Sequence, residues 1–310
     1  MTKSAGRILV TLSTFCEDEP APRQLLVRSG FAFVENTSGR RMTPEEILAA
    51  GTDWIGLVAG VEPYKAETLA QMPALRCISR VGIGLDAIDL MAAKARGIVV
   101  RNTPDAPVAA VAEMTVAQML DLLKRLTWHA ALMRQKKWSK KTGSMLEGRT
   151  VGLIGTGRIG RAVAARLVPF GVKLLGADPA PDAVWAATVG LEYCGLAELL
   201  TSADVVSLHA SRPAADGPVL GAAEIARMKP GAILINTARG HLVDAAALEA
   251  ALRSGALAGA GLDVFPEEPY AGGLCELDNV VLTPHIATLT SETRRRMEME
   301  AVENLLEELK

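Results

Sequence analysis

The sequence has few cysteines, no long apolar run and almost no excess of charge of either sign. Its four cysteines are scattered through 310 residues without a CxxC pair or metal-ligand spacing, which argues against a disulfide framework and against a metal site. No apolar stretch approaches the length that crosses a bilayer, and the short one before Glu17 does not resemble a secretion signal. The 33 basic and 35 acidic residues are interspersed, so no basic face for nucleic acid is expected. These absences predict a soluble cytoplasmic protein with reduced, mostly buried cysteines and no membrane or nucleic-acid partner.

The most informative part of the chain is a strand–turn–helix–strand pattern near its centre. An apolar run, 151–154, leads into Gly155-Thr156-Gly157-Arg158-Ile159-Gly160, and a segment of helical period follows. A second apolar run, 172–177, then ends at Asp178. This is the order of elements that a dinucleotide site requires, and the agreement of all its parts favours such a site over an incidental glycine turn.

Each glycine of this motif, and the acid after it, has a physical role. Gly155 permits a tight turn, Gly157 lets the backbone approach a pyrophosphate, and Gly160 lets the helix pack closely on the strand. The free N–H groups at the start of the helix then face the anion. Asp178 would accept hydrogen bonds from ribose hydroxyls and repel a 2′-phosphate, so the sequence predicts NAD rather than NADP.

Strand and helix patterns alternate along both halves of the chain, which is long enough for two domains. A capping box at Thr43–Glu46 and helix-ending glycines mark some of the helices. The expected strands outside the central motif are Ile8–Leu12, Phe31–Val34, Trp54–Ala59, Leu75–Val81, Ile98–Arg101, Leu191–Cys194, Asp204–His209, Ala232–Asn236, Ala258–Val264 and Val280–Leu282. Alternating units of this kind predict an α/β fold with two doubly wound, mostly parallel sheets.

Two interruptions of this alternation suggest where one domain gives way to the other. The first is the proline-containing segment 102–107, after which Pro107 is expected to open a long helix running to about Leu126. The second is Thr283-Pro284-His285, which precedes a final amphipathic helix, 291–309. If that helix returns to the first domain, the chain crosses between the domains twice, near 102–107 and 284–290. The two crossings would be hinges beside a cleft that holds the substrate.

Three polar residues follow successive strands of the second predicted sheet. Arg239 comes after Ala232–Asn236, Glu268 lies beyond Ala258–Val264, and His285 follows Val280–Leu282. Each alone is unremarkable, since an arginine there is usually a surface charge and a histidine often a helix cap. Ligands of parallel α/β sheets bind at the carboxyl ends of the strands. The three residues together therefore favour a catalytic site over unrelated surface side chains.

Hydride transfer to a 2-keto acid gives these residues their expected roles. The planar guanidinium of Arg239 suits the substrate carboxylate and keto oxygen better than a lysine does. His285 can protonate the keto oxygen as negative charge develops on it. A carboxylate on the far ring nitrogen, from Glu268, would hold the tautomer and favour the imidazolium.

Motifs along nearly the whole chain resemble those of the D-isomer-specific 2-hydroxyacid dehydrogenases, in the branch that resembles phosphoglycerate dehydrogenase. They include Gly82-Ile83-Gly84-Leu85-Asp86, GTGRIG, NTARG at 236–240, LDVFPEEP at 262–269 and TPHI at 283–286. The resemblance implies a Rossmann NAD domain, 103–284, inserted in a flavodoxin-like substrate domain, 1–102 plus 285–310. It also implies that Arg239, Glu268 and His285 are catalytic.

The resemblance further assigns binding residues. The implied cofactor-binding residues are Gly155, Gly157, Arg158, Ile159, Gly160, Asp178, His209, Thr237, Ala238 and Asp263. His209 would lie near the adenosine or be a packed strand-end histidine, and Asp263 would lie near the nicotinamide amide or cap a strand end. Backbone N–H groups around Val81, Gly82, Ile83 and Gly84, together with Arg239, are implied to hold the substrate carboxylate.

One loop departs from the pattern of the family. Ala59-Gly60-Val61-Glu62-Pro63 stands where phosphoglycerate dehydrogenases have an Arg-Ser-type loop whose arginine binds phosphate. A small unphosphorylated 2-keto acid is therefore the expected substrate. The alternatives are 3-phosphoglycerate dehydrogenase of serine biosynthesis, an NADPH-dependent glyoxylate/hydroxypyruvate reductase and, in another class, a dinucleotide-sensing scaffold like the corepressors of this fold.

The segment Val108–Lys141 is expected to form a homodimer contact. Its helix has more apolar surface than one domain face needs, and Trp128, Trp138 and a basic cluster follow. The alternative is a helix covered by its own domain. The resemblance places a dimer contact in the same region.

Some enzymes of the family are sensitive to serine through a long C-terminal extension. The sequence lacks such an extension, so this regulation is not expected.

Overall fold

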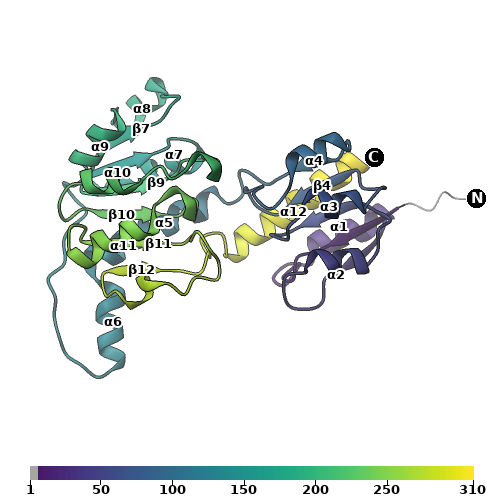
Figure 1. Ribbon diagram of the computed structural model, residues 1–310, viewed down its shortest axis with the longest axis horizontal. Helices are drawn as coiled ribbons and strands as arrows, with labels where there is room; N and C mark the ends of the chain where they lie inside the picture. Colours follow the sequence, from purple (N-terminus) through teal and green to yellow (C-terminus); the bar gives the residue numbers. More distant parts are fainter. Residues whose placement is uncertain (1–5) are drawn as a thin grey trace, which may run out of the picture. The chain divides into compact units, whose positions relative to one another are not determined.

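The computed structural model describes residues 6–310, which divide into two compact units (Figure 1). Unit 1 runs to Pro107 and resumes at Leu289, and unit 2 runs from Val108 to Thr288. Both are α/β units with parallel sheets, as the alternating pattern predicts. Within residues 6–310, no helix is both long and apolar enough to cross a membrane.

Unit 1 contains a five-stranded sheet in the order β2-β1-β3-β4-β5, the order of a flavodoxin-like fold. Its strands are β1 Arg7–Val10, β2 Ala32–Glu35, β3 Trp54–Ala59, β4 Cys77–Arg80 and β5 Val99–Arg101. Its helices are α1 Ala21–Ser29, α2 Pro44–Ala49, α3 Ala66–Ala70, α4 Leu90–Ala95 and α12 Ser291–Leu309. The helix α12 lies against this sheet (Figure 1), and Gly56 on β3 leaves room for the side chain of Leu305.

Unit 2 contains a seven-stranded sheet in the order β12-β11-β10-β9-β6-β7-β8. Numbered from β6, the order is 3-2-1-4-5-6 with one further strand, which is the Rossmann arrangement. The strands are β6 Thr150–Ile154, β7 Lys173–Ala177, β8 Leu191–Tyr193, β9 Val205–Leu208, β10 Ile233–Asn236, β11 Gly259–Leu262 and β12 Val280–Leu282. The helices are α5 Val108–Lys124, α6 Leu126–Arg134, α7 Arg158–Leu167, α8 Ala183–Val189, α9 Leu196–Ser202, α10 Ala222–Arg227 and α11 Ala245–Ser254.

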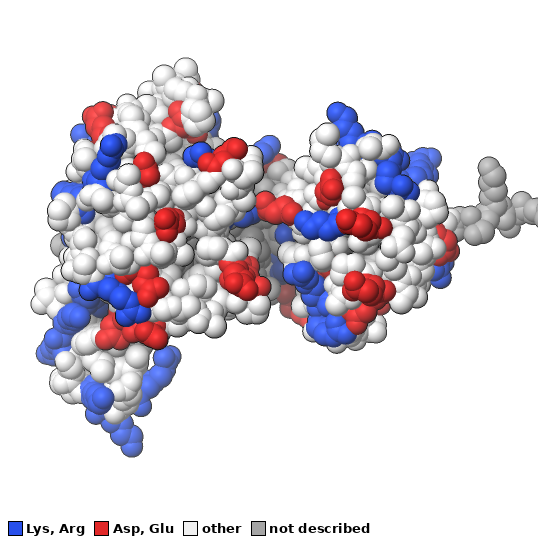
Figure 2. All heavy atoms as spheres, in the orientation of Figure 1, with Lys and Arg blue, Asp and Glu red and all other residues white. Residues whose placement is uncertain are grey.

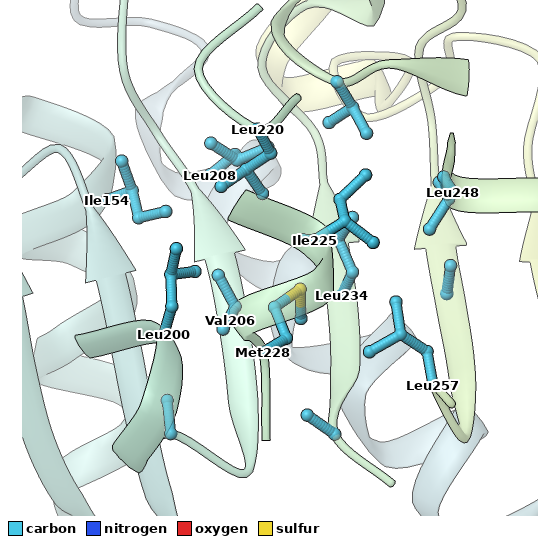
Figure 3. Close-up of a cluster of buried hydrophobic side chains, with 14 of the residues drawn as sticks. Ile154, Leu200, Val206, Leu208, Leu220, Ile225, Met228, Leu234, Leu248 and Leu257 are labelled. Atoms are coloured by element: carbon cyan, nitrogen blue, oxygen red, sulfur yellow. The ribbon is translucent and has the colours of Figure 1, made fainter. Parts of the chain in front are cut away.

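The strands of unit 2 are apolar because helices cover both faces of the sheet. Figure 3 shows part of one core layer, in which Val206 and Leu234 from neighbouring strands meet Ile225 and Met228 from the α10 region. This packing fixes the strand ends, and with them the loops that follow β10, β11 and β12.

The long helix expected to open at Pro107 and run to about Leu126 is α5, which ends at Lys124, and the separate helix α6 follows it directly. Arg125 has a φ of 56°, in the left-handed region, and separates α5 from α6. The returning chain explains the break. The N–H of Ser144 donates to the Leu123 carbonyl at 2.7 Å and so occupies the acceptor that the next helical turn would otherwise use. The amide of Thr127 is instead capped by Asp121 at 2.8 Å.

The boundaries between the units lie a few residues beyond the positions 102/103 and 284/285 that the sequence suggests. Thr103 belongs to unit 1 because it exchanges two hydrogen bonds with Gly82. The segment 285–288 belongs to unit 2 because the amides of Ile286 and Ala287 donate to Asp263.

The expectation of mostly buried cysteines was also wrong. Cys77 is buried on β4, Cys16 and Cys194 are partly exposed, and Cys275 is exposed in a surface turn. A small side chain in a loop does not need an apolar environment, so composition alone did not indicate this.

Candidate active site

The glycine motif joins β6 to α7 with the close approaches that only glycine allows. Gly155 has a φ of 94°, and a Cβ there would lie 2.7 Å from the backbone of His209 and Ala210. A Cβ on Gly160 would lie 2.2 Å from the Gly155 carbonyl oxygen, so both glycines are required by packing. A Cβ on Gly157 would meet no other atom within 4 Å, and no side chain caps the start of α7. The turn therefore offers open backbone amides to an anion.

Asp178, directly after β7, faces the same turn. Its Oδ2 accepts hydrogen bonds from the amide of Thr156 at 2.6 Å and from its hydroxyl at 3.1 Å, and its Oδ1 accepts from the amide of Ala180 at 2.8 Å. Partial burial opposes ionisation, but these hydrogen bonds and the charge of Arg161 outweigh it and lower the pKa of the Asp178 carboxyl. The glycine turn therefore faces a carboxyl group whose ionised form is favoured.

His209 lies under the glycine turn at the end of β9. Burial lowers its pKa to about 4, so the ring is neutral at physiological pH. Its Nε2 lies 2.9 Å from the hydroxyl of Ser207, whereas its buried Nδ1 has no hydrogen-bond partner in residues 6–310. Buried polar atoms are rarely left unpaired, so this nitrogen and the open turn fit a bound dinucleotide.

The loop after β10 carries Arg239 and is held by Asn236. The side-chain Nδ2 of Asn236 donates to the Arg239 carbonyl at 2.8 Å, and its Oδ1 accepts from the Ala238 N–H at 3.0 Å. A Cβ on Gly240 would lie 1.9 Å from the backbone of Phe265, so this glycine lets the loops after β10 and β11 touch.

Thr237, in the same loop, is fixed from α5. Its hydroxyl lies 2.9 Å from that of Thr115, which itself donates to the Val111 carbonyl at 2.8 Å. Thr237 is 7% exposed and Ala238 is partly exposed, so this part of the loop backs onto the sheet.

Glu268 and His285 come together directly. Oε2 of Glu268 lies 2.9 Å from Nδ1 of His285, while its Oε1 accepts from the Phe265 amide at 3.0 Å. A carboxylate only accepts, so Nδ1 carries the hydrogen of this contact, and Nε2 is the ring nitrogen that the contact leaves available. His285 has a φ of 54°, a conformation that a non-glycine residue adopts only where its surroundings impose it.

Asp263 supplies much of that constraint. The carboxylate is fully buried and accepts from the amides of Ile286 at 2.9 Å and Ala287 at 2.8 Å, and from the hydroxyl of Thr283 at 2.5 Å. Gln118 on α5 donates to the same hydroxyl at 3.2 Å. Asp263 therefore anchors both sides of the histidine loop. Sequence reasoning missed Thr283 and Gln118, because hydroxyl and amide side chains carry no periodic signal.

In unit 1, the loop after β4 is tied down at two of its four amides. The N–H of Val81 donates to the Ala59 carbonyl at 2.9 Å, and that of Gly82 donates to Thr103 Oγ1 at 2.8 Å. Asn102 donates to the Ile83 carbonyl at 2.8 Å. These hydrogen bonds tie the loop to the rest of unit 1.

Glu62 is folded into unit 1 rather than extended toward solvent. It is 2% exposed, and its Oε2 accepts from Thr11 Oγ1 at 2.8 Å and from the Gly60 amide at 2.9 Å. These groups lie at the carboxyl ends of β1 and β3, where the strand order of this sheet reverses. Such a switch point is where open α/β sheets bind ligands.

Comparison with known proteins agrees with this geometry. The family profile described as "D-isomer specific 2-hydroxyacid dehydrogenase, NAD binding domain" matches residues 116–287. The chain belongs to this family. Unit 2 is accordingly the nicotinamide dinucleotide-binding unit of a D-isomer specific 2-hydroxyacid dehydrogenase.

Relatives in this family differ in the activities for which they are named. A hydroxypyruvate reductase of Thermotoga maritima is 41% identical over 241 residues, covering 76% of this chain and 78% of that protein. A D-3-phosphoglycerate dehydrogenase of Mycobacterium leprae is 38% identical over 252 residues, covering 80% of this chain and 48% of the relative. The chain thus spans about half the length of the phosphoglycerate dehydrogenases that it matches. The crystal structure of an NADPH-dependent glyoxylate/hydroxypyruvate reductase from Sinorhizobium meliloti has a TM-score of 0.83 at 33% identity, covering 97% of this chain and 93% of that one.

Proposed function

We propose that this chain is an NAD-dependent D-2-hydroxyacid dehydrogenase that acts mainly as a reductase of small 2-keto acids. The observation that carries the proposal is the Glu268–His285 pair, 2.9 Å apart, on the sheet that also carries the dinucleotide motif and Asp178. The family membership of unit 2 supports the same reaction class.

The residues of unit 2 divide the proposed reaction among themselves. A bound dihydronicotinamide supplies the hydride. Arg239 binds the substrate carboxylate and polarises the keto oxygen, because its planar guanidinium can contact both. His285 donates the proton from Nε2 to the developing alkoxide, and Glu268 stabilises the imidazolium through Nδ1. In unit 1, the N–H groups of Val81 and Gly82 already donate within the unit, so of the four amides expected to hold the substrate carboxylate, those of Ile83 and Gly84 remain the proposed donors.

Asp178 carries the cofactor preference in this proposal. An ionised carboxylate beside the ribose accepts hydrogen bonds from the ribose hydroxyls and repels a 2′-phosphate. Both effects favour NADH over NADPH. The NADPH-dependent relative makes the opposite preference the second candidate.

A panel of 2-keto acids followed by NADH absorbance tests the proposal. We expect turnover of glyoxylate or hydroxypyruvate, with a higher kcat/KM for NADH than for NADPH. Binding of dinucleotide without turnover of any acid would contradict an enzyme and support the sensing scaffold. A higher kcat/KM with NADPH would instead establish the second candidate.

We also propose a homodimer that uses α6 and the basic segment after it. None of the residues of α6 is buried, Met133 and Trp138 are 55% and 80% exposed, and Figure 2 shows Lys and Arg side chains gathered on this projecting part of unit 2. Exposed aromatic and apolar anchors with a charged rim suit an interface. The basic residues are Arg134, Lys136, Lys137, Lys140 and Lys141.

Light scattering at micromolar concentration is expected to give the mass of two chains. The double variant Met133→Glu, Trp138→Glu is expected to shift the mass toward one chain, because charges replace the apolar anchors. Val27→Glu, at a position on α1 that is 63% exposed, is the matched control and is expected to leave the mass unchanged. A single-chain mass for the unmodified protein would disprove the dimer.

A further inference from the structure

Asp178 lies at the end of a chain of hydrogen bonds that starts at Asp182 and passes through Tyr193. The Asp182 N–H donates to the Tyr193 hydroxyl at 3.2 Å, and that hydroxyl lies 2.8 Å from Thr156 Oγ1. Thr156 Oγ1 donates to Asp178 Oδ2 at 3.1 Å. An ionised carboxylate only accepts, so the Thr156 proton points to Asp178 and Tyr193 must donate to Thr156. All the hydrogen bonds of the chain therefore run in one direction, toward the carboxylate.

The tyrosine is held in place by the packing of β8 on β7. A Cβ on Gly176 would lie 3.2 Å from the Tyr193 ring and 2.7 Å from Leu191 Cδ2, so the glycine opens the space that the ring occupies. Gly176 is also the residue opposite Tyr193 in the strand pairing, two positions before Asp178. The ring and the carboxylate are thus fixed by the same pair of strands.

Arg161 secures the other side of Thr156. Its Nε donates to the Thr156 carbonyl at 3.0 Å, and its Nη2 donates to Asp182 Oδ2 at 2.9 Å. Asp182 in turn caps α8 by accepting from the Trp185 amide at 3.0 Å. Thr156 is therefore held at its carbonyl by Arg161 and at its hydroxyl by Tyr193, and this hydroxyl donates to Asp178.

We infer that Tyr193 is a positioning residue for the cofactor: through Thr156 it holds Asp178 in the orientation that binds the ribose diol of NADH. The inference rests on the proposed cofactor role of Asp178. Without the tyrosine hydroxyl, Thr156 Oγ1 loses its donor and can rotate away, and Asp178 loses one of the two contacts on Oδ2. Binding of NADH then weakens more than binding of NADPH, because a less restrained carboxylate can move away from a 2′-phosphate.

The test measures dissociation constants for NADH and NADPH by fluorescence, and kcat/KM with each. One neutral hydrogen bond changes an equilibrium by roughly threefold to tenfold. Tyr193→Phe is therefore expected to lower the ratio of kcat/KM for NADH to that for NADPH by this factor, and to raise the corresponding ratio of dissociation constants. Tyr64→Phe is the matched control. It removes a buried tyrosine hydroxyl 3.0 Å from Thr11 Oγ1 in unit 1, and it is expected to leave the ratio unchanged.

The route through Asp178 is tested in the Asp178→Ala background. There, adding Tyr193→Phe is expected to change the ratio no further, since effects that act through one residue are not additive. A Tyr193→Phe variant that melts earlier but keeps the ratio would overturn the inference, as would an equal effect with and without Asp178. If Asp178→Ala alone leaves the ratio unchanged, both this inference and the proposed preference for NAD fail.

Discussion

Replacing His285 with alanine is expected to lower kcat by roughly 10² to 10⁴-fold while leaving the affinity for NADH unchanged. The imidazole is the proposed proton donor to the keto oxygen, and it lies on the loop after β12 rather than in the glycine turn that binds the dinucleotide. Steady-state kinetics with hydroxypyruvate and a fluorescence titration with NADH separate the two quantities. His241→Ala is the control, because it removes another partly exposed histidine of unit 2, whose Nε2 lies 2.8 Å from the Arg212 carbonyl. Full activity of the His285 variant would remove this residue from the mechanism.

Glu268→Gln extends this prediction to the second member of the pair. The amide oxygen can still accept from the Phe265 N–H, but the variant loses the charged partner of His285 Nδ1, so the ring is held less firmly. The kcat with hydroxypyruvate is therefore expected to fall, by a smaller factor than in His285→Ala, while the affinity for NADH stays unchanged. An unchanged kcat would show that the pair does not act in the reaction.

Hydroxypyruvate is expected to be reduced with a kcat/KM about tenfold to a hundredfold higher than 3-phosphohydroxypyruvate. The two substrates differ only in the phosphate, and the loop Gly60–Pro63 has no arginine to bind it. The carboxyl group of Glu62, buried at the switch point of the sheet of unit 1, offers a phosphate no cationic partner. Glyoxylate, which has no third carbon to carry a phosphate, serves as a second unphosphorylated reference.

A higher kcat/KM for the phosphorylated substrate would contradict this prediction. It would point to another cation as the phosphate ligand, and Lys65, Arg80 and the basic segment 134–141 are the candidates that the sequence offers. Replacing each by alanine and repeating the comparison would identify which one binds the phosphate.

The sequence predicts the strands and the ends of strands well, because their apolar runs are a direct consequence of burial on both faces of a parallel sheet. It expects Glu268 beside His285, and the structure has their atoms at hydrogen-bonding distance. It also expects the final helix at the residues where α12 lies. Each of these expectations depends on local pattern or on which edge of a sheet a loop must leave.

What the sequence could not show depends on contacts between distant segments. The break at Arg125 follows from an amide at position 144, and nothing in the helical period of α5 announces it. Tyr193 reads as an ordinary strand residue until the ring is seen opposite Gly176. The partners of Asp263 are likewise set by how the loops after β11 and β12 fold together.

The path of the chain through its two units has a consequence for synthesis on the ribosome. Unit 2 is one continuous segment, so all of its strands are available once residue 288 has emerged. Unit 1 supplies the earlier segment, yet its core includes Met297, Ala301, Val302 and Leu305 of the 19-residue helix α12. Domains fold as units during synthesis, so the unit that begins to emerge first is completed last. Until α12 arrives, the apolar face of β3 and β4 that it covers stays open, and exposed apolar surface of this kind makes a partly folded chain prone to aggregation.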